Sequence, residues 1–370
     1  MSASNGWGRD VFSLGLAIQN LLWGVGQPFA GAFADKFGAA RVLSIGAIMY
    51  AAGLALMTLS SDPLVFHLTA GTLIGFGLSG SAFTIVVAAF GKLLPEEWRS
   101  AGFGVATAAG SLGQFLFAPI TAGLLESIGW KGVCLTFALL MLAVLPLSLA
   151  LAAPRTDTAA GTSGKDPGIA QTIADAFHHP SYVLLVLGFF TCGFQLAFIT
   201  VHMPAYLKDL GLATWVGGWT LAAIGLFNIF GSLTAGWAGN LMPKRYILAA
   251  IYLARSVAIA GFLIAPASPA SAIIFGAAMG LLWLSTIPPT SSLVALMFGT
   301  RYMSMLFGFA FFSHQLGGFL GVWLGGILYE RFGSYDPVWW GAIALGIASA
   351  VINLPIIEKP APERVRPATA

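Results

Sequence analysis

Charged residues are scarce in this chain. Only 8% of its 370 residues are Asp, Glu, Lys or Arg, whereas 58% are apolar. A soluble domain carries about 25% charged residues. A surface with so little charge would not stay dissolved in water. The sequence therefore excludes a soluble globular protein and predicts that the chain is solvated by lipid.

Carboxylates are missing from the middle of the apolar stretches. All fourteen acids fall in the predicted loops or near the ends of the predicted spans. Proton-coupled pumps of cationic drugs usually need a carboxylate inside the membrane. The sequence therefore disfavours that class of pump, and it leaves histidine or the substrate itself as the proton carrier.

Features of metal sites, cofactor sites and enzymes are lacking as well. The chain has two cysteines, Cys134 and Cys192, and both lie in apolar runs, so neither a disulfide framework nor a metal site is expected. The glycine-rich runs lie inside the apolar stretches and do not follow a strand, as a phosphate-binding loop would require. The scattered bases do not suggest nucleic-acid binding. We expect no cofactor and no enzymatic activity.

What the chain has instead is a series of eleven long apolar stretches. A helix needs roughly 20 apolar residues to cross a bilayer. The stretches are 11–34, 42–60, 64–91, 101–126, 132–153, 182–207, 215–241, 246–266, 270–297, 302–329 and 337–357. They predict an all-α multi-pass membrane protein. Its expected parts are an N-terminal bundle in 1–153, a polar linker or surface helix at 154–181, a C-terminal bundle in 182–357 and a tail at 358–370.

A short polar hinge, Gly31 to Arg41, separates the first two stretches and indicates the orientation. It holds Asp35, Lys36 and Arg41 in surroundings that are nearly free of charge. If the hinge is cytoplasmic, twelve of the seventeen bases lie in cytoplasmic loops and four lie on the other side. This distribution agrees with the positive-inside rule. We therefore predict a plasma (inner) membrane protein whose linker and C-terminus are cytoplasmic.

The two halves of the chain repeat each other. The matched residues, about 205 positions apart, are Gly31 with Gly236, Asp35 with Asn240, and Leu112-Gly113 with Leu316-Gly317. Matches at one offset indicate an internal repeat of two homologous bundles. The second half has six predicted spans and the first has five. We expect the partner of span 182–207 to be absent from this sequence, through truncation, a late start or real loss.

The segment Gly31-x-x-x-Asp35-Lys36-x-Gly38 resembles the loop signature of the major facilitator superfamily, in which it joins the second and third of twelve helices. The family usually has a base where this chain has Ala39-Ala40, and here Arg41 follows one position later. Three less specific segments resemble the monocarboxylate and oxalate/formate branch. They are Asn5-Gly6-Trp7-Gly8-Arg9, Gln19 to Gly24, and Ser313-His314-Gln315-Leu316-Gly317.

This resemblance implies a major facilitator fold of two pseudo-symmetric bundles, with five plus six helices here and twelve in the family. It implies secondary transport by alternating access around a site at the midplane. It also implies that Asp35 braces the cytoplasmic gate; the alternative is that Asp35 and Lys36 are solvated loop charges.

Arg255 is a charged residue that the sequence places inside a predicted span, 246–266. It lies roughly 15 Å beyond Arg245 along a helix. A base at the centre of a membrane helix costs about 2.5–3.5 kcal/mol, so it needs a partner. Two interpretations stay open: Arg255 grips a substrate carboxylate, or it is held by backbone carbonyls and polar side chains. The resemblance places it on a helix that is usually peripheral to the cavity.

Other polar groups within the spans are candidates for substrate binding or coupling. His314 and His202 could each carry a proton, because histidine titrates near physiological pH; otherwise each is neutral and bonded to a neighbouring helix. The amides bind substrate or hold helices together, and they are Gln315, Gln195, Asn228, Gln114 and Asn20. Trp283 belongs to a proline-interrupted segment that is either a gating bend or a static kink.

The sequence thus predicts a secondary active transporter of a small solute, with a small organic anion such as a monocarboxylate as the favoured substrate. The expected partners are that solute, a coupling proton or counter-anion and the lipid bilayer, and the protein is expected to work as a monomer. One alternative is an exporter of a neutral or amphipathic compound. Another is a transport-inactive membrane sensor or partner protein.

Overall fold

The computed structural model describes residues 9–59, 61–151 and 168–361. All regular secondary structure in these residues is helical. The elements are α2 (Arg9–Phe37), α3 (Ala39–Leu56), α4 (Pro63–Phe66), the π-helical turn η1 (His67–Leu73), α5 (Ile74–Ser81), α6 (Phe83–Leu93), α7 (Glu96–Leu142), α8 (Val144–Ser148), the 3-10 turn η2 (Leu149–Leu151), α9 (Ile169–His178), α10 (Pro180–Asp209), α11 (Thr214–Leu241), α12 (Lys244–Ile264), α13 (Pro269–Leu282), α14 (Ile287–Phe298), α15 (Met303–Phe332) and α16 (Asp336–Asn353).

Each of the eleven predicted stretches is helical over most of its described length, as expected where lipid offers no hydrogen bonds to the backbone. Eight helical stretches of the described chain are long and apolar enough to cross a membrane, by length and composition. The predicted spans 11–34, 101–126 and 337–357 are helical but are not among these eight. The all-α multi-pass fold is thus confirmed.

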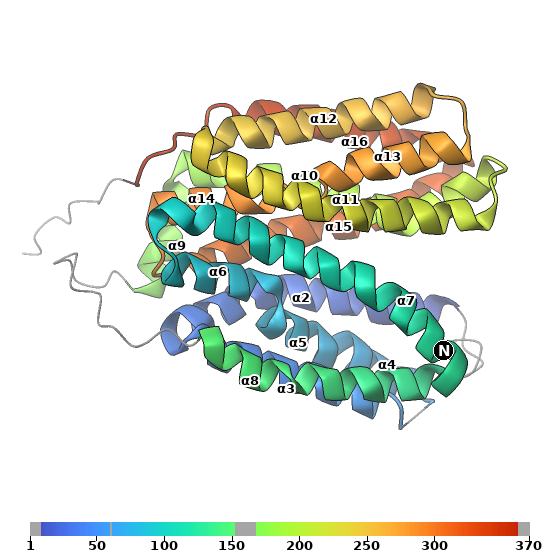
Figure 1. The fold of residues 1–370 in the computed structure, drawn as a ribbon, viewed down its shortest axis with the longest axis horizontal. Helices are drawn as coiled ribbons and strands as arrows, with labels where there is room; N and C mark the ends of the chain where they lie inside the picture. The colour runs from blue at the N-terminus through green and yellow to red at the C-terminus, as the bar shows by residue number, and fades with distance from the viewer. Residues whose placement is uncertain (1–8, 60, 152–167, 362–370) are drawn as a thin grey trace, which may run out of the picture.

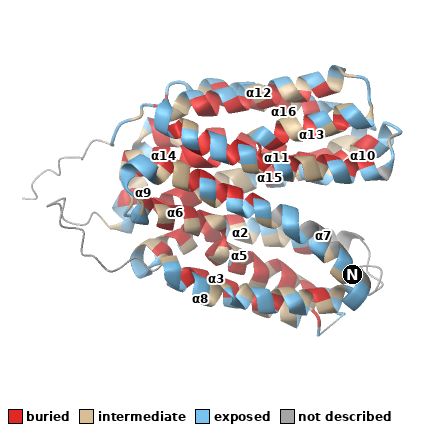
Figure 2. Cartoon of the chain, viewed as in Figure 1, coloured by how far each residue is buried: buried red, intermediate tan, exposed pale blue. Residues whose placement is uncertain are grey.

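The helices form two bundles that lie side by side. Helices α2 to α8, blue to green, make up the lower one in Figure 1, and α10 to α16, yellow-green to red, make up the upper one. Helices α2 and α7 of the first bundle pack against α15 and α11 of the second. Buried residues face the helix contacts, and exposed ones cover the outside (Figure 2). Large apolar side chains such as Leu139 and Ile264 are exposed there, which suits a surface facing lipid.

Helix α7 contains the predicted span 101–126 and the first part of the span 132–153, which continues in α8 and η2. Gly129 lies inside it with φ 66° and ψ 174°, a non-helical conformation that bends the chain. A residue with a Cβ rarely adopts this positive φ. The bend separates the two stretches predicted at 101–126 and 132–153.

Two other stretches are interrupted helices. Residues 63–93 contain η1 and a break at Ala82, which has extended backbone angles. Residues 269–298 are broken between Leu282 and Ile287. Pro288 and Pro289 follow the second break and have no N–H to donate, so they cannot continue the hydrogen-bond ladder of α13. The two breaks occupy corresponding places in the repeated halves.

The repeat is also visible in the contacts between the bundles. A Cβ on Gly31 of α2 would collide with the carbonyl oxygen of Ser304 on α15, and a Cβ on Gly236 of α11 would collide with that of Ser100 on α7. Glycine at these two equivalent positions lets the backbones of the two bundles touch.

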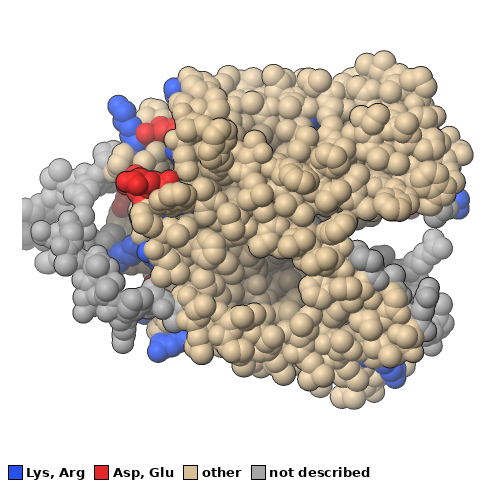
Figure 3. Space-filling view, viewed as in Figure 1, with Lys and Arg blue, Asp and Glu red and all other residues tan. Residues whose placement is uncertain are grey.

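Charged side chains gather at one end of the molecule (Figure 3). The N-terminus lies at the opposite end (Figure 1), so α2 ends at the charged end, which we call the hinge end. The middle of the surface in this view carries almost no charge, as a lipid-facing belt requires. At the opposite end a slot separates the two bundles (Figure 3). The bundles are therefore joined at the hinge end and parted at the other.

Candidate functional site

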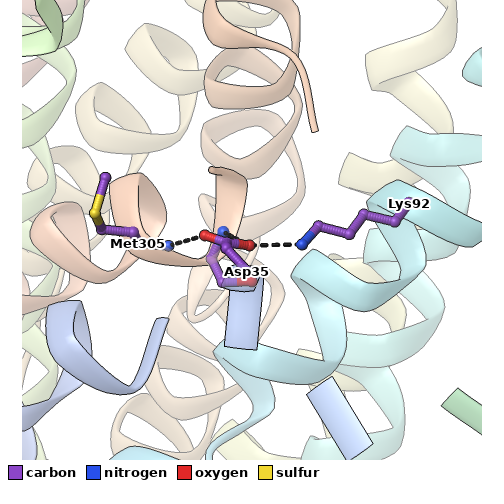
Figure 4. A network of polar contacts seen from close by, with 4 residues as sticks. Asp35, Lys92 and Met305 are labelled. Carbon is purple, nitrogen blue, oxygen red and sulfur yellow. Dashed lines mark hydrogen bonds and ion pairs between the residues drawn. The ribbon is translucent and has the colours of Figure 1, made fainter. Parts of the chain in front are cut away.

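Asp35 joins the two bundles at the hinge end. It lies in the last turn of α2, and its side chain is fully buried. One carboxylate oxygen, Oδ1, accepts from Lys92 Nζ at 2.7 Å and from the backbone N–H of Ser304 at 3.2 Å. The other, Oδ2, accepts from the N–H of Met305 at 2.8 Å (Figure 4). The carboxylate thus links α2 to α6 and to α15.

The first turn of α15 is a suitable partner for a carboxylate. Ser304 and Met305 are the second and third residues of the helix, whose N–H groups have no partner within it. The positive end of the helix dipole also favours an anion at this position. Burial raises the pKa of Asp35 above its ordinary value, and the ammonium of Lys92 and the hydrogen bonds act in the opposite direction.

The bases of the hinge do not hold Asp35. Lys36 is exposed and lies over the ring of Phe37 at 5.3 Å, and Arg41 is exposed as well. Gly38 forms the turn between α2 and α3 with φ 95°. Lys92, the partner that the structure provides, comes from a different helix and was missed by sequence reasoning.

Arg255 lies inside the second bundle with 0% of its surface exposed. Its Nε and Nη2 donate to the carbonyl of Leu282, at 3.1 and 2.6 Å, and Nη2 also donates to the carbonyl of Trp283. These carbonyls stand at the end of α13, where the break removes their helical donors. Arg255 therefore caps a broken helix, which favours the second of the two interpretations that the sequence left open.

The remaining donors of Arg255 contact α10. Nη1 donates to Gln195 Oε1 at 3.4 Å, and Nη2 reaches Cys192 Sγ at 3.6 Å. Gln195 is fully buried, and its Nε2 donates to the carbonyl of Ala342 on α16 at 2.9 Å. Cys192 lies 3.3 Å from Thr286 Oγ1 in the break. The structure thus brings Arg255, Gln195 and Trp283 together in one buried network.

Asn228 holds the break from the side of α11. Its Oδ1 accepts from the N–H of Leu284 at 3.0 Å and from Ser232 Oγ at 3.2 Å. Its Nδ2 donates to Ser111 Oγ on α7, in the other bundle, at 2.7 Å. The amide thus links α11 to α7 and to the break.

A cluster of rings lies where the bundles meet, and we call it the His314 cluster. The ring of His314 stacks on Phe311 at 5.3 Å and lies 5.1 Å from Phe189. Trp23 and Phe83 also pack on Phe311, at 5.1 and 5.8 Å. The five residues come from α2, α6, α10 and α15, and therefore from both bundles.

Two glutamines next to this cluster each have a side-chain amide nitrogen that is not used in a hydrogen bond within the described residues. Gln315 Oε1 contacts His314 Nδ1 at 3.2 Å, and Gln27 Oε1 accepts from Trp23 Nε1 at 3.1 Å. Gln315 lies against Gly24 of α2. The Nε2 atoms of both glutamines are buried without a hydrogen-bond partner among the described residues. Such groups usually find a partner, so they are candidates for binding a solute.

The other candidate residues are not part of this cluster. His202 Nε2 lies 3.0 Å from the carbonyl of Val322, and its ring packs on Phe198 and Tyr335. Asn20 is exposed and donates to the carbonyl of Leu16 in its own helix at 2.9 Å. The side chain of Gln114 lies outside the described part of the chain.

The chemistry that these residues offer is binding. The described residues contain no group of His, Cys, Asp and Glu that could hold a metal ion. Around His314 there are aromatic faces and hydrogen-bond donors at a junction of two bundles, an arrangement that suits reversible contact with a solute.

Two relatives of the chain are named as transporters. Its sequence is 27% identical over 362 residues to an uncharacterized MFS-type transporter, YcxA, of Bacillus subtilis, covering 95% of this chain and 87% of that protein. It is 28% identical over 358 residues to monocarboxylate transporter 13 of Rattus norvegicus, covering 93% and 79%.

The fold is similar to that of solved transporters. The fucose:proton symporter FucP of E. coli superposes with a TM-score of 0.72 and 16% identity, over 93% of this chain and 92% of that one. A structure of FucP in the outward conformation gives a TM-score of 0.70. A family model described as the Major Facilitator Superfamily matches residues 1–322. The chain therefore belongs to the major facilitator superfamily.

Proposed function

We propose that this protein is a secondary active transporter that carries a small organic anion, such as a monocarboxylate, by alternating access. The observation that carries the proposal is the junction at Asp35. It joins the bundles at the hinge end, while Figure 3 shows a slot between them at the other end. A carrier that works by alternating access has two states, and in each state the bundles are closed at one end and separated at the other. The structure has the arrangement of one of these states. FucP in its outward conformation has a similar fold.

The groups near His314 support an anionic substrate. Gln27 and Gln315 each present an unpartnered amide nitrogen, and a protonated His314 would add a positive charge. The His314 cluster itself is built from aromatic side chains and His314, and none of its five residues is an acid. Amide N–H groups are hydrogen-bond donors and therefore suit a carboxylate ligand. A relative named as a monocarboxylate transporter agrees with this substrate class.

For orientation, we propose that the hinge end faces the cytoplasm, as the positive-inside distribution indicates. The proposed location is the plasma or inner membrane. We further propose that the protein acts as a monomer. Asp35, with Lys92 and the first turn of α15, braces the cytoplasmic gate. Coupling runs through a proton on His314 or through exchange with a second anion.

A neutral or amphipathic compound is the second candidate substrate. The aromatic faces of Trp23, Phe83 and Phe311 favour it, because rings bind apolar and cationic groups without needing a substrate carboxylate. For such a compound the direction of transport would be export.

The test is counterflow in vesicles that contain the purified protein. Vesicles are loaded with unlabelled lactate, pyruvate, formate or oxalate, or with a neutral amphipathic compound. Uptake of the same compound in labelled form is followed with and without a pH gradient. Counterflow of a monocarboxylate supports the proposal. Flux restricted to neutral amphipathic compounds supports the second candidate, and a protein that switches conformation but moves none of them is a sensor or partner protein.

A further inference from the structure

The break between α13 and α14 exposes backbone groups deep in the second bundle. An unpartnered N–H or C=O at membrane depth costs several kcal/mol, so each needs a partner. Arg255 takes the carbonyls of Leu282 and Trp283, and Asn228 Oδ1 takes the N–H of Leu284. Two side chains that approach from different helices thus hold backbone groups of the break.

Asn228 differs from Arg255 because it also contacts the other bundle. Its Nδ2 donates to Ser111 Oγ on α7, and this hydroxyl donates in turn to the carbonyl of Thr107 at 3.0 Å. Asn228, Ser111 and Ser232 are each 0% exposed. A single planar amide thus holds the N–H of the break with its oxygen and the first bundle with its nitrogen.

We propose that Asn228 is a positioning residue that couples the movement of α7 to the break between α13 and α14. The side-chain amide of Asn228 is planar and rigid. If its Nδ2 follows Ser111, its Oδ1 must move as well, and Oδ1 is bonded to the N–H of Leu284. When the bundles rock, the bond to Ser111 is made in the hinge-closed state and lost in the hinge-open state, and the break is released with it. The inference rests on the alternating access proposed above.

The break is linked by hydrogen bonds to α10, so a movement of the break can be transmitted to that helix. Its carbonyls are bound by Arg255, which also reaches Gln195 and Cys192 on α10. Cys192 also lies against Thr286, two residues beyond Leu284 in the break. Helix α10 carries Phe189 of the His314 cluster. A change at Asn228 therefore reaches the proposed binding region through adjoining hydrogen bonds.

The chain offers a matched pair of variants. Ser111→Ala removes the hydrogen bond from Asn228 Nδ2 to the other bundle and leaves the bond between Asn228 and Leu284 in place. Ser232→Ala removes a hydroxyl from the same amide, with the same burial, but only within α11. Replacing Asn228 itself would leave the N–H of Leu284 without a partner, so that variant would not separate folding from coupling.

Two distances between spin labels report the state of the bundles. Labels at Leu93 and Met242 report the hinge end, and labels at Leu59 and Ile264 report the opposite end; all four side chains are exposed. The background carries Cys134→Ala, because Cys134 is partly exposed and Cys192 is buried. These distances need no substrate, so they decide the inference even if every transport assay is negative.

In Ser111→Ala we expect the ratio of hinge-closed to hinge-open molecules to fall roughly threefold, the effect of losing one average hydrogen bond between membrane helices. In Ser232→Ala the ratio should stay at the wild-type value. An unchanged ratio in Ser111→Ala, or an equal fall in both variants, overturns the proposal and leaves Asn228 as a static link between helices.

Discussion

The carboxylate of Asp35, at the end of a helix of the first bundle, accepts a hydrogen bond of 2.8 Å from the backbone N–H of Met305, at the start of a helix of the second. The partner on α15 is a backbone group, so its position is fixed by the helix itself. The bond can therefore form only when α2 and the start of α15 are close together, which is the closed arrangement of the hinge end.

Removing the carboxylate should open the hinge end. Asp35→Ala leaves the N–H groups of Ser304 and Met305 and the ammonium of Lys92 without their partner. Hydrogen bonds to charged groups are worth about 1.5–3 kcal/mol, so the closed state should lose stability by about that amount. Labelling of Met305→Cys by a membrane-impermeant thiol reagent should become faster. Asp62→Ala is the control, because Asp62 is an exposed acid that follows the other end of α3 from the hinge. Equal labelling in both variants would contradict the brace.

Acid should favour the closed hinge end. Burial raises the pKa of Asp35 in the closed state, whereas a hydrated carboxylate in the open state keeps the ordinary value of about 3.9. The state with the higher pKa binds the proton more tightly, so it gains stability as pH falls through the raised pKa towards the ordinary value and loses it as pH rises. The distance between labels at Leu93 and Met242 should report more closed protein at pH 4.5 than at pH 7. Asp35→Asn should abolish the change, and opening on acidification would show that the sign is wrong.

Arg255→Lys should lower stability more than it changes substrate affinity. Lysine keeps the charge but has no planar fork, so it cannot bind the carbonyls of Leu282 and Trp283 in the same way. An unpartnered buried group costs about 1–3 kcal/mol, and we expect a loss of that size in thermal unfolding. The KM of the surviving fraction should be close to that of the wild type. Arg331→Lys, at an exposed end of α15, is the control; a large rise in KM without loss of stability would favour substrate binding by Arg255.

The features that the sequence predicted best are those that depend on local composition. Apolar stretches of sufficient length became helices, and the repeat of Gly31 at Gly236 reappears as two equivalent close contacts between the bundles. The break at Ala82 had no proline to indicate it, so residues 64–91 were predicted as one uninterrupted span. The partners of Asp35 and Arg255 could not be predicted, because they come from helices distant in the sequence. Lys92, for example, lies 57 residues from Asp35.

His314 and His202 offer a matched comparison for proton coupling. His314 contacts rings from both bundles, whereas His202 Nε2 lies 3.0 Å from the carbonyl of Val322 within the second bundle. If a proton on His314 accompanies the anion, His314→Gln should make monocarboxylate uptake nearly independent of external pH between pH 5 and 8, because glutamine does not titrate. His202→Gln should keep the wild-type pH profile even where it lowers the amount of folded protein. A flat profile in the wild type would remove both histidines as proton carriers and leave anion exchange, whereas a normal profile in His314→Gln would assign the proton to another group or to the substrate.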